Sequence, residues 1–174
     1  MNLTIFITMI LETDRLIIRK LTKEDAPFFY DLVNDESWKR FIGDRNVNTI
    51  QDAEDYLTNK IMASYQKFGF GFYLIIEKET NNSIGISGFI KRDELQYVDV
   101  GFAFLPFGRG KGYAFESTKA LMKYGQRELN FSTVLAIANN NNERSHRLLE
   151  KLGLRFDRYV KLYDEEEEIS LFTT

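Results

Sequence analysis

Hydrophobic residues recur along the chain at two different spacings, and these spacings predict its secondary structure. Between residues 49 and 67, apolar side chains such as Ala53 and Leu57 fall three or four positions apart, which marks one face of a helix. Short runs rich in β-branched and aromatic residues, bounded by turn residues, predict strands. The predicted strands are residues 15–20, 70–77, 84–91, 95–104, 132–138, 154–163 and 167–173, and the predicted helices are residues 23–34, 36–41, 49–67, 115–129 and 143–152.

The order of these elements, β-α-α-α-β-β-β-α-β-α-β-β, is typical of an α+β domain. It predicts one mixed, mostly antiparallel central sheet flanked by helices. Residues 84–91 and 95–104 are separated by the short polar turn 92–94 and are expected to form a hairpin. Residues 1–10 precede the pattern and are expected to be an N-terminal extension, either an extra strand or a disordered segment. Residues 11–174 then form a single domain.

Composition excludes several functional classes. The chain carries 26 acidic and 23 basic residues, a net charge of −3, whereas a general nucleic-acid binder is usually basic. It has no cysteine, which rules out disulfides, thiolate zinc sites and a cysteine nucleophile. No run of about 18 apolar residues is present, so no membrane span is expected. These features predict a cytoplasmic protein whose partners include neither nucleic acid nor membrane.

A glycine-rich loop at residues 107–114 is the most informative local feature. Its sequence, Phe-Gly-Arg-Gly-Lys-Gly-Tyr-Ala, follows a predicted strand and precedes a predicted helix. Glycines let backbone N–H groups approach a ligand, and the helix start adds the positive end of a dipole. The loop therefore predicts a site for a phosphate or pyrophosphate, with added charge from Arg109 and Lys111. The alternative is an ordinary turn with solvated cations.

Two common phosphate motifs do not fit this loop. A P-loop needs a serine or threonine directly after its lysine, but Lys111 is followed by Gly112. The dinucleotide fingerprint G-x-G-x-x-G belongs near the start of a βαβ unit, whereas this loop reads G-x-G-x-G and comes late in the chain. The loop is therefore neither a P-loop nor a dinucleotide-binding fingerprint.

Two blocks of the sequence resemble the GNAT superfamily of N-acetyltransferases. Residues 109–114 match its [QR]-x-x-G-x-[GA] signature. Residues 142–154 are similar to its second block, an asparagine followed by a helix that ends in K-x-G-[FL]. Residues 11–19 and 41–43 resemble the branch that contains the ribosomal-protein N-terminal (alanine/serine) acetyltransferases. The resemblance extends over residues 11–172.

This resemblance implies acetyl-coenzyme A as co-substrate and an amine as acceptor, either a small molecule or a protein N-terminus. It is compatible with a monomer or a homodimer. In the superfamily the strand before the loop parts from its neighbour, and the pantetheine arm bonds to the backbone of that strand. The implied coenzyme-binding residues are Phe102, Ala103, Phe104, Leu105, Arg109, Gly110, Lys111, Gly112, Tyr113, Ala114, Asn142 and Ser145. For the apolar residues of the strand, simple packing in the sheet core is the other interpretation.

Acetyl transfer from a thioester needs a base for the amine proton and hydrogen-bond donors for the carbonyl and the leaving thiolate, and it requires no metal. Asp99 is the first candidate base, because it shares a strand face with the small residues Gly101 and Ala103. That face could border a cavity or solvent. Asp164, in the acidic run 164–168, is the second candidate, although such a run is usually a solvated turn.

Ser145 resembles the position whose hydroxyl meets the coenzyme sulfur. Many superfamily members have a tyrosine four residues later, but this chain has Leu149 there. Asn142 is interpreted as a helix N-cap, a coenzyme contact, or both. Trp38, Phe41 and Phe72 are predicted either to line the acceptor site or to pack in the core. The remaining alternative function is a coenzyme-binding sensor or interaction domain without transfer activity.

Overall fold

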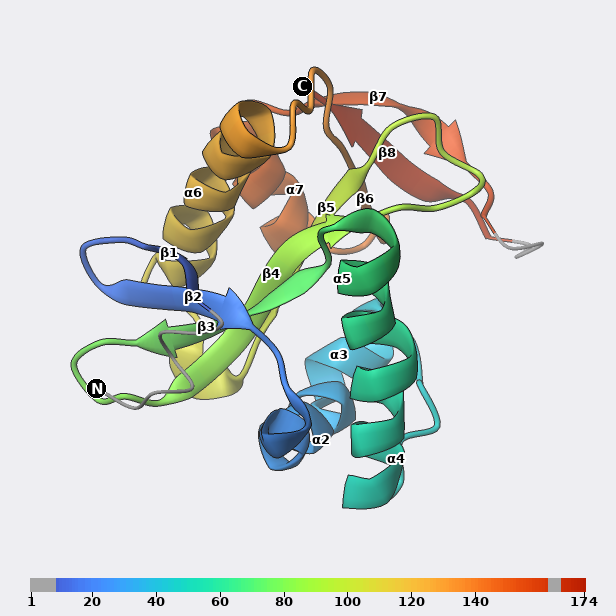
Figure 1. The fold of residues 1–174 in the computed structure, drawn as a ribbon. Helices are drawn as coiled ribbons and strands as arrows, with labels where there is room; N and C mark the ends of the chain where they lie inside the picture. The colour runs from blue at the N-terminus through green and yellow to red at the C-terminus, as the bar shows by residue number, and fades with distance from the viewer. Residues whose placement is uncertain (1–8, 163–166) are drawn as a thin grey trace.

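A computed structural model describes residues 9–162 and 167–174 and contains one eight-stranded sheet (Figure 1). Its strand order is β1-β2-β3-β4-β5-β6-β8-β7, and only the β5–β6 pair is parallel. The strands are β1 (Met9–Glu12), β2 (Leu16–Lys20), β3 (Phe72–Glu77), β4 (Ser83–Ile90), β5 (Asp99–Phe104), β6 (Leu135–Ala138), β7 (Arg155–Val160) and β8 (Ile169–Thr173). The predicted mixed, mostly antiparallel sheet is confirmed.

Helices cover both faces of this sheet (Figure 1). The first set, α2 to α5, precedes β3 and packs on one face, whereas α6 and α7 pack on the other. Their bounds are η1 (Lys23–Asp25), α2 (Ala26–Asn34), α3 (Glu36–Phe41), α4 (Ile50–Tyr56), the π-helical segment η2 (Leu57–Met62), α5 (Ala63–Phe68), η3 (Pro106–Gly108), α6 (Tyr113–Glu128) and α7 (Glu143–Lys151).

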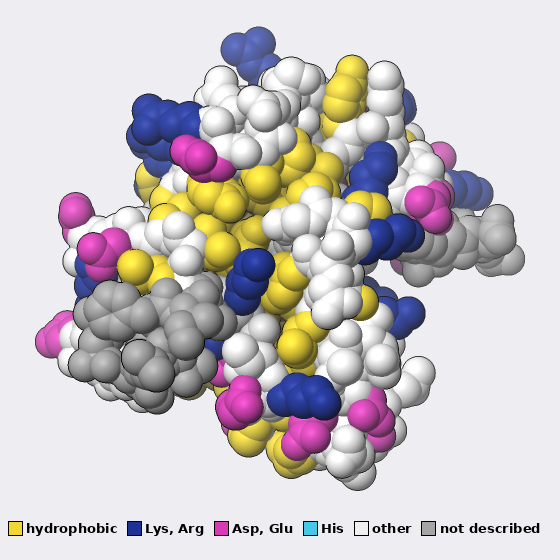
Figure 2. All heavy atoms as spheres, in the orientation of Figure 1, with side chains coloured by type: hydrophobic (Ala, Val, Ile, Leu, Met, Phe, Trp, Pro, Cys, Tyr) yellow, Lys and Arg dark blue, Asp and Glu magenta, His cyan; other side chains and the backbone are white. Residues whose placement is uncertain are grey.

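Alternation along the strands divides the apolar residues between two large cores. In β2, for example, Leu16 and Ile18 face α6 and α7, whereas Ile17 between them faces the helices α2 to α5. A third, smaller cluster lies at β6 and β8 and includes Leu95 from the β4–β5 connection. Figure 2 shows hydrophobic side chains gathered near the centre of one face, with acidic and basic side chains interspersed around them.

Element boundaries agree with the sequence pattern in most places and differ in a few. The connection between β4 and β5 is longer than the predicted turn 92–94, and β5 begins at Asp99 instead of residue 95. Leu95 leaves the sheet because its side chain is buried against the third cluster, while its carbonyl accepts a hydrogen bond from Lys91 Nζ at 3.1 Å. Part of the predicted extension forms β1, and residues 1–8 lie outside the described part. No helix in that part is both long and apolar enough to cross a membrane.

Candidate active site

Strand β5 parts from β6 soon after the two strands meet. β5 is paired with β4 from Asp99 to Phe104, but with β6 it shares one register position, Asp99 opposite Leu135. The bond at that position runs from Leu135 N to the carbonyl of Val98, at 2.9 Å. Because β5 and β6 are parallel, their carboxyl ends lie at the same edge of the sheet. The gap between them opens toward that edge.

The backbone of β5 presents its polar groups to this gap at alternate residues. The Val98 carbonyl is directed to β6, so the N–H and C=O groups of Phe102 and Phe104 are directed to the same side. Leu105 N donates instead to Ile84 O of β4, at 3.0 Å, and Ala103 is likewise directed to β4. Of the four residues predicted to contact a pantetheine arm, two therefore have backbone groups facing the gap.

The loop after β5 keeps a row of backbone donors without partners. Gly110 and Gly112 have positive φ angles of 75° and 82°, which explains why glycine occupies both positions. Gly112 is also the N-cap residue of α6, and no side chain caps this helix. Within the described residues, the N–H groups of residues 110–115 have no hydrogen-bond acceptor. Unpaired N–H groups at a helix start are suited to an anion, which is the role that the glycine spacing predicts for this loop.

The two cations of the loop have different surroundings. Arg109 donates from Nε to the carbonyl of Phe104 at 2.7 Å, and from Nη2 to the carboxylate of Asp35. Its guanidinium is thus held by protein groups. Lys111 Nζ lies 3.9 Å from a carboxylate oxygen of Glu77, but 53% of the Lys111 side chain is exposed. The structure therefore leaves Lys111, more than Arg109, open to an anion.

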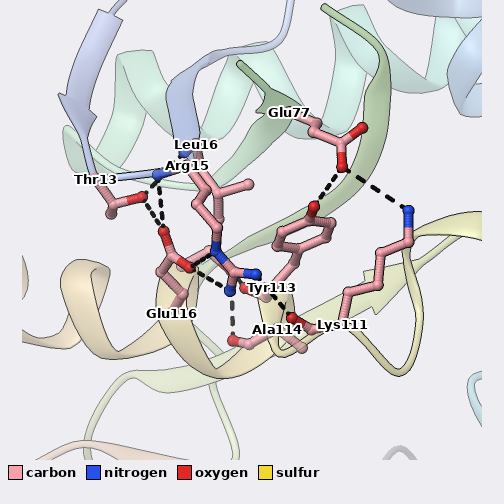
Figure 3. A network of polar contacts seen from close by, with 9 residues as sticks. Thr13, Arg15, Leu16, Glu77, Lys111, Tyr113, Ala114 and Glu116 are labelled. Atoms are coloured by element: carbon pink, nitrogen blue, oxygen red, sulfur yellow. Dashed lines mark hydrogen bonds and ion pairs between the residues drawn. The ribbon is translucent and has the colours of Figure 1, made fainter. Parts of the chain in front are cut away.

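A polar network from the N-terminal strands fixes the first turn of α6 (Figure 3). Arg15 donates to Glu116 Oε2 at 2.7 Å and to the carbonyl of Lys111 at 3.0 Å. Thr13 Oγ1 donates to Glu116 Oε1 at 2.6 Å. The Arg15 guanidinium also lies 4.5 Å from the centre of the Tyr113 ring. The turn between β1 and β2 thus holds both the loop and the helix start.

A buried carboxylate holds the loop from a second direction. The Tyr113 hydroxyl donates to Glu77 Oε1 (Figure 3). Thr80 Oγ1 donates to Glu77 Oε2 at 2.5 Å. Hydrogen bonds from Thr80 and Tyr113 lower the pKa of Glu77, and the bond to Glu77 raises the pKa of Tyr113. Sequence reasoning missed Arg15 and Glu77, because no motif marks residues that meet the loop only in the folded chain.

The second helix start at this edge of the sheet belongs to α7, which follows β6. Asn142 is its N-cap, and its side-chain oxygen accepts from Ser145 N at 3.2 Å, which confirms the predicted cap. Ser145 is partly buried in the first turn. Leu149 is 1% exposed and belongs to the core below α6 and α7. The parallel strands β5 and β6 therefore bring Ser145 and the glycine-rich loop to one edge.

Residues 15–155 match the family model of the acetyltransferase (GNAT) domain. The chain belongs to the GNAT family of N-acetyltransferases. It is 28% identical over 155 residues to the uncharacterized N-acetyltransferase YoaA of Bacillus subtilis, covering 88% of this chain and 87% of YoaA. It is 26% identical to the [ribosomal protein uS5]-alanine N-acetyltransferase of Escherichia coli, covering 88% and 81%.

The fold of this GNAT protein also matches solved structures. It superposes with a TM-score of 0.81 on the ribosomal L7/L12 α-N-protein acetyltransferase RimL in complex with coenzyme A, at 15% identity, covering 95% of this chain and 97% of that one. An acetyltransferase from Agrobacterium tumefaciens gives a TM-score of 0.79 at 23% identity, covering 94% and 92%. These comparisons confirm the predicted fold.

Asp99 of this GNAT protein lies at the point where β5 and β6 separate. It is 1% exposed, and Arg92 Nε donates to its Oδ1 at 2.9 Å. The prediction that Asp99 faces solvent, one of the two alternatives, is therefore wrong. Burial raises the pKa of Asp99, and the charge and hydrogen bond of Arg92 oppose this rise. The second candidate acid, Asp164, lies outside the described residues.

The predicted acceptor residues have different degrees of burial. Trp38 is 6% exposed and packs edge-on against Phe29, with ring centres 6.3 Å apart. Phe41 and Phe72 are partly buried, and the Arg40 guanidinium lies 4.9 Å from the Phe41 ring. Trp38 thus has the core position that was one of its two predicted roles. Within the described residues, no cluster of three metal-binding side chains is present.

Proposed function

We propose that this protein transfers the acetyl group of acetyl-coenzyme A to a primary amine, by direct attack in a ternary complex. The observation that carries this proposal is the coincidence of two features at one edge of the sheet. One is the gap beside Phe102 and Phe104, and the other is the row of unpaired N–H groups at residues 110–115. The coenzyme A bound to the structurally similar RimL supports the same donor.

The residues present fit such a donor. Its pyrophosphate suits the N–H groups of residues 110–115, with the exposed Lys111 ammonium beside them. Its pantetheine amides suit the backbone groups of Phe102 and the N–H of Phe104. When bound, acetyl-coenzyme A supplies an acyl group already activated as a thioester. The protein then needs only to orient the amine, take its proton and hold the departing thiolate.

Asp99 is the proposed acceptor of the amine proton, directly or through water. Burial raises the pKa of Asp99, which makes its carboxylate a stronger base than that of an exposed aspartate. Asp164 is the second proposed acid. Ser145 is proposed to donate a hydrogen bond to the leaving sulfur, because Leu149 offers no polar group there.

The proposed acceptor is an α-amine at a protein N-terminus. The similar enzyme from Escherichia coli acts, by its name, on an alanine of ribosomal protein uS5. A small amine such as a polyamine or an amino sugar is the competing acceptor class within the same chemistry.

Release of coenzyme A thiol tests this proposal directly. Acetyl-coenzyme A is incubated with the protein and a panel of peptides with free alanine or serine N-termini, polyamines and aminoglycosides, and free thiol is measured with a disulfide dye. The chain contributes no cysteine to the signal. Thiol release with the peptides supports the proposal. Tight binding of coenzyme A without release across the panel would instead favour a binding domain without transfer activity.

A further inference from the structure

Arg109 joins the glycine-rich loop and the end of β5 to a part of the molecule that is distant in sequence. Its Nε bonds to the carbonyl of Phe104 at the end of β5, and its Nη2 bonds to Asp35, 74 residues earlier in the chain. The same Asp35 oxygen accepts from Ser37 N at 3.1 Å and so caps α3. One guanidinium therefore connects β5 and the glycine-rich loop at residues 107–114, here called the donor loop, to the start of α3.

We propose that Arg109 is a positioning residue that couples the donor loop to α3, and that its side chain is not a phosphate ligand. This inference rests on the proposed function. The side chains of Asp35 and Arg109 are 12% and 29% exposed, and breaking so shielded an ion pair leaves a poorly solvated charge. Anion contacts are already available from the backbone N–H groups of residues 110–115 and from Lys111.

The coupling has a consequence on the acceptor side of the protein. Helix α3 carries Trp38 and Phe41, two of the residues predicted for the acceptor site. When the donor loop is ordered by coenzyme A, the Arg109–Asp35 pair transmits that order to the first turn of α3. The donor and acceptor sites are then linked through one ion pair, and each should support the other by the same factor.

The charge of Asp35 distinguishes this role from phosphate binding. If the Arg109 guanidinium bound phosphate, Asp35 would compete for it, and removal of the Asp35 charge would tighten coenzyme A binding. If the pair positions the loop, removal of that charge weakens binding. Asp35→Asn makes this test cleanly, because asparagine is also a favourable N-cap and preserves the bond to Ser37 N.

The first measurement is a double-mutant cycle on coenzyme A affinity by calorimetry. Asp35→Asn and Arg109→Gln are each expected to weaken binding by roughly 5-fold or more, and the double variant should be no weaker than either. Asp31→Asn, at an exposed acid on the preceding helix α2, is the matched control and should bind as the wild type does. Tighter binding in Asp35→Asn, or additive losses, would overturn the inference.

The second measurement uses Trp38, the single tryptophan of the chain, which lies three residues after Asp35. Saturating coenzyme A should reduce acrylamide quenching of Trp38 in the wild type and in Asp31→Asn, but not in Asp35→Asn. If Arg109→Gln does not fold by circular dichroism, Arg109→Lys replaces it, since lysine keeps the charge but cannot make both bonds. A wild type that fails to bind coenzyme A refutes the proposed function and this inference together. Normal binding and turnover in Asp35→Asn refutes this inference alone.

Discussion

The helices α6 and α7 begin at the same edge of the sheet, after the parallel strands β5 and β6, but their first turns are completed differently. At α7 the chain supplies its own cap, because the side chain of Asn142 accepts from Ser145 N. At α6 the N-cap residue is Gly112, which has no side chain, and the N–H groups of residues 110–115 have no acceptor in the described structure. The start of α7 therefore has a side-chain cap, whereas the start of α6 has none and is called the open start below.

The difference teaches that side-chain contacts from other elements, and not a cap, fix the first turn of α6. The first turn of a helix has N–H groups that need partners, and a glycine in the left-handed region costs conformational entropy. Here Arg15 and Thr13 bind Glu116, and Tyr113 is anchored on Glu77, so the turn is fixed without using its N–H groups. Arg15 also neutralises Glu116, whose charge would otherwise repel an anion. The N–H groups of the open start therefore stay unpaired in the described structure.

The largest effect on activity is expected at Asp99, which lies outside both helix starts, because it is the proposed acceptor of the amine proton. Asp99→Asn should lower kcat by roughly 10²-fold or more. The wild type should lose activity as pH falls through the pKa of Asp99. Since burial raises this pKa, the loss begins at a higher pH than an exposed aspartate would give. Asp93→Asn, at an exposed acid of the same connection, is the control. An unchanged pH–rate profile in Asp99→Asn would show that Asp99 does not accept the amine proton.

A valine at each of two glycines tests whether the α6 start binds the donor. Gly112→Val forces a branched side chain into the left-handed region, at a cost of about 1–2 kcal/mol, and should weaken coenzyme A binding about tenfold or more. Gly153→Val imposes similar strain at φ 95°, just after α7, and should lower only the free energy of unfolding. Calorimetry and thermal melting separate the two effects. Equal losses of affinity in both variants would contradict the comparison.

Ser145→Ala separates the hydroxyl of this residue from its role in the capped turn. The cap uses the Ser145 backbone N–H, so the alanine variant should fold normally. If the hydroxyl stabilises the departing thiolate, kcat should fall about tenfold or more, because a hydrogen bond to a charged group contributes roughly 1.5–3 kcal/mol. The KM for acetyl-coenzyme A should change little, and Ser145→Thr should recover activity. Full kcat in the alanine variant would discard the role.

The smallest effect is expected for the Asn142 cap at the start of α7. Asn142→Ala should lower the free energy of unfolding by about 1 kcal/mol, and Asn142→Asp should preserve it, because aspartate caps equally well. Denaturant unfolding measures the first effect and calorimetry measures coenzyme A affinity. A large loss of affinity in Asn142→Ala at unchanged stability would show that α7 also binds the donor. That result would support the coenzyme contact predicted from sequence.

Features that depend on neighbouring residues were predictable from sequence. The bounds of the short helix 36–41 and the Asn142 cap agree with the pattern, because each is set by residues within one or two turns. The fixation of the loop was not predictable, because Arg15 and Glu116 are 101 residues apart. Only the folded sheet brings such residues together. The bond from Arg109 to Asp35 was not predictable for the same reason, since the motif around Arg109 does not reveal a partner 74 residues away.

The separation of β5 from β6 gives the sheet a line along which it is joined weakly. Strands β1 to β5 form one continuous hydrogen-bonded section and β6 to β8 another, and these sections share a single register position. An extended arm lying in the gap would take the place of missing strand-to-strand bonds and connect the two sections. The free energy of donor binding then adds to the free energy of unfolding. In that sense the molecule is built from two half-sheets, and a donor arm bound between them would complete the sheet.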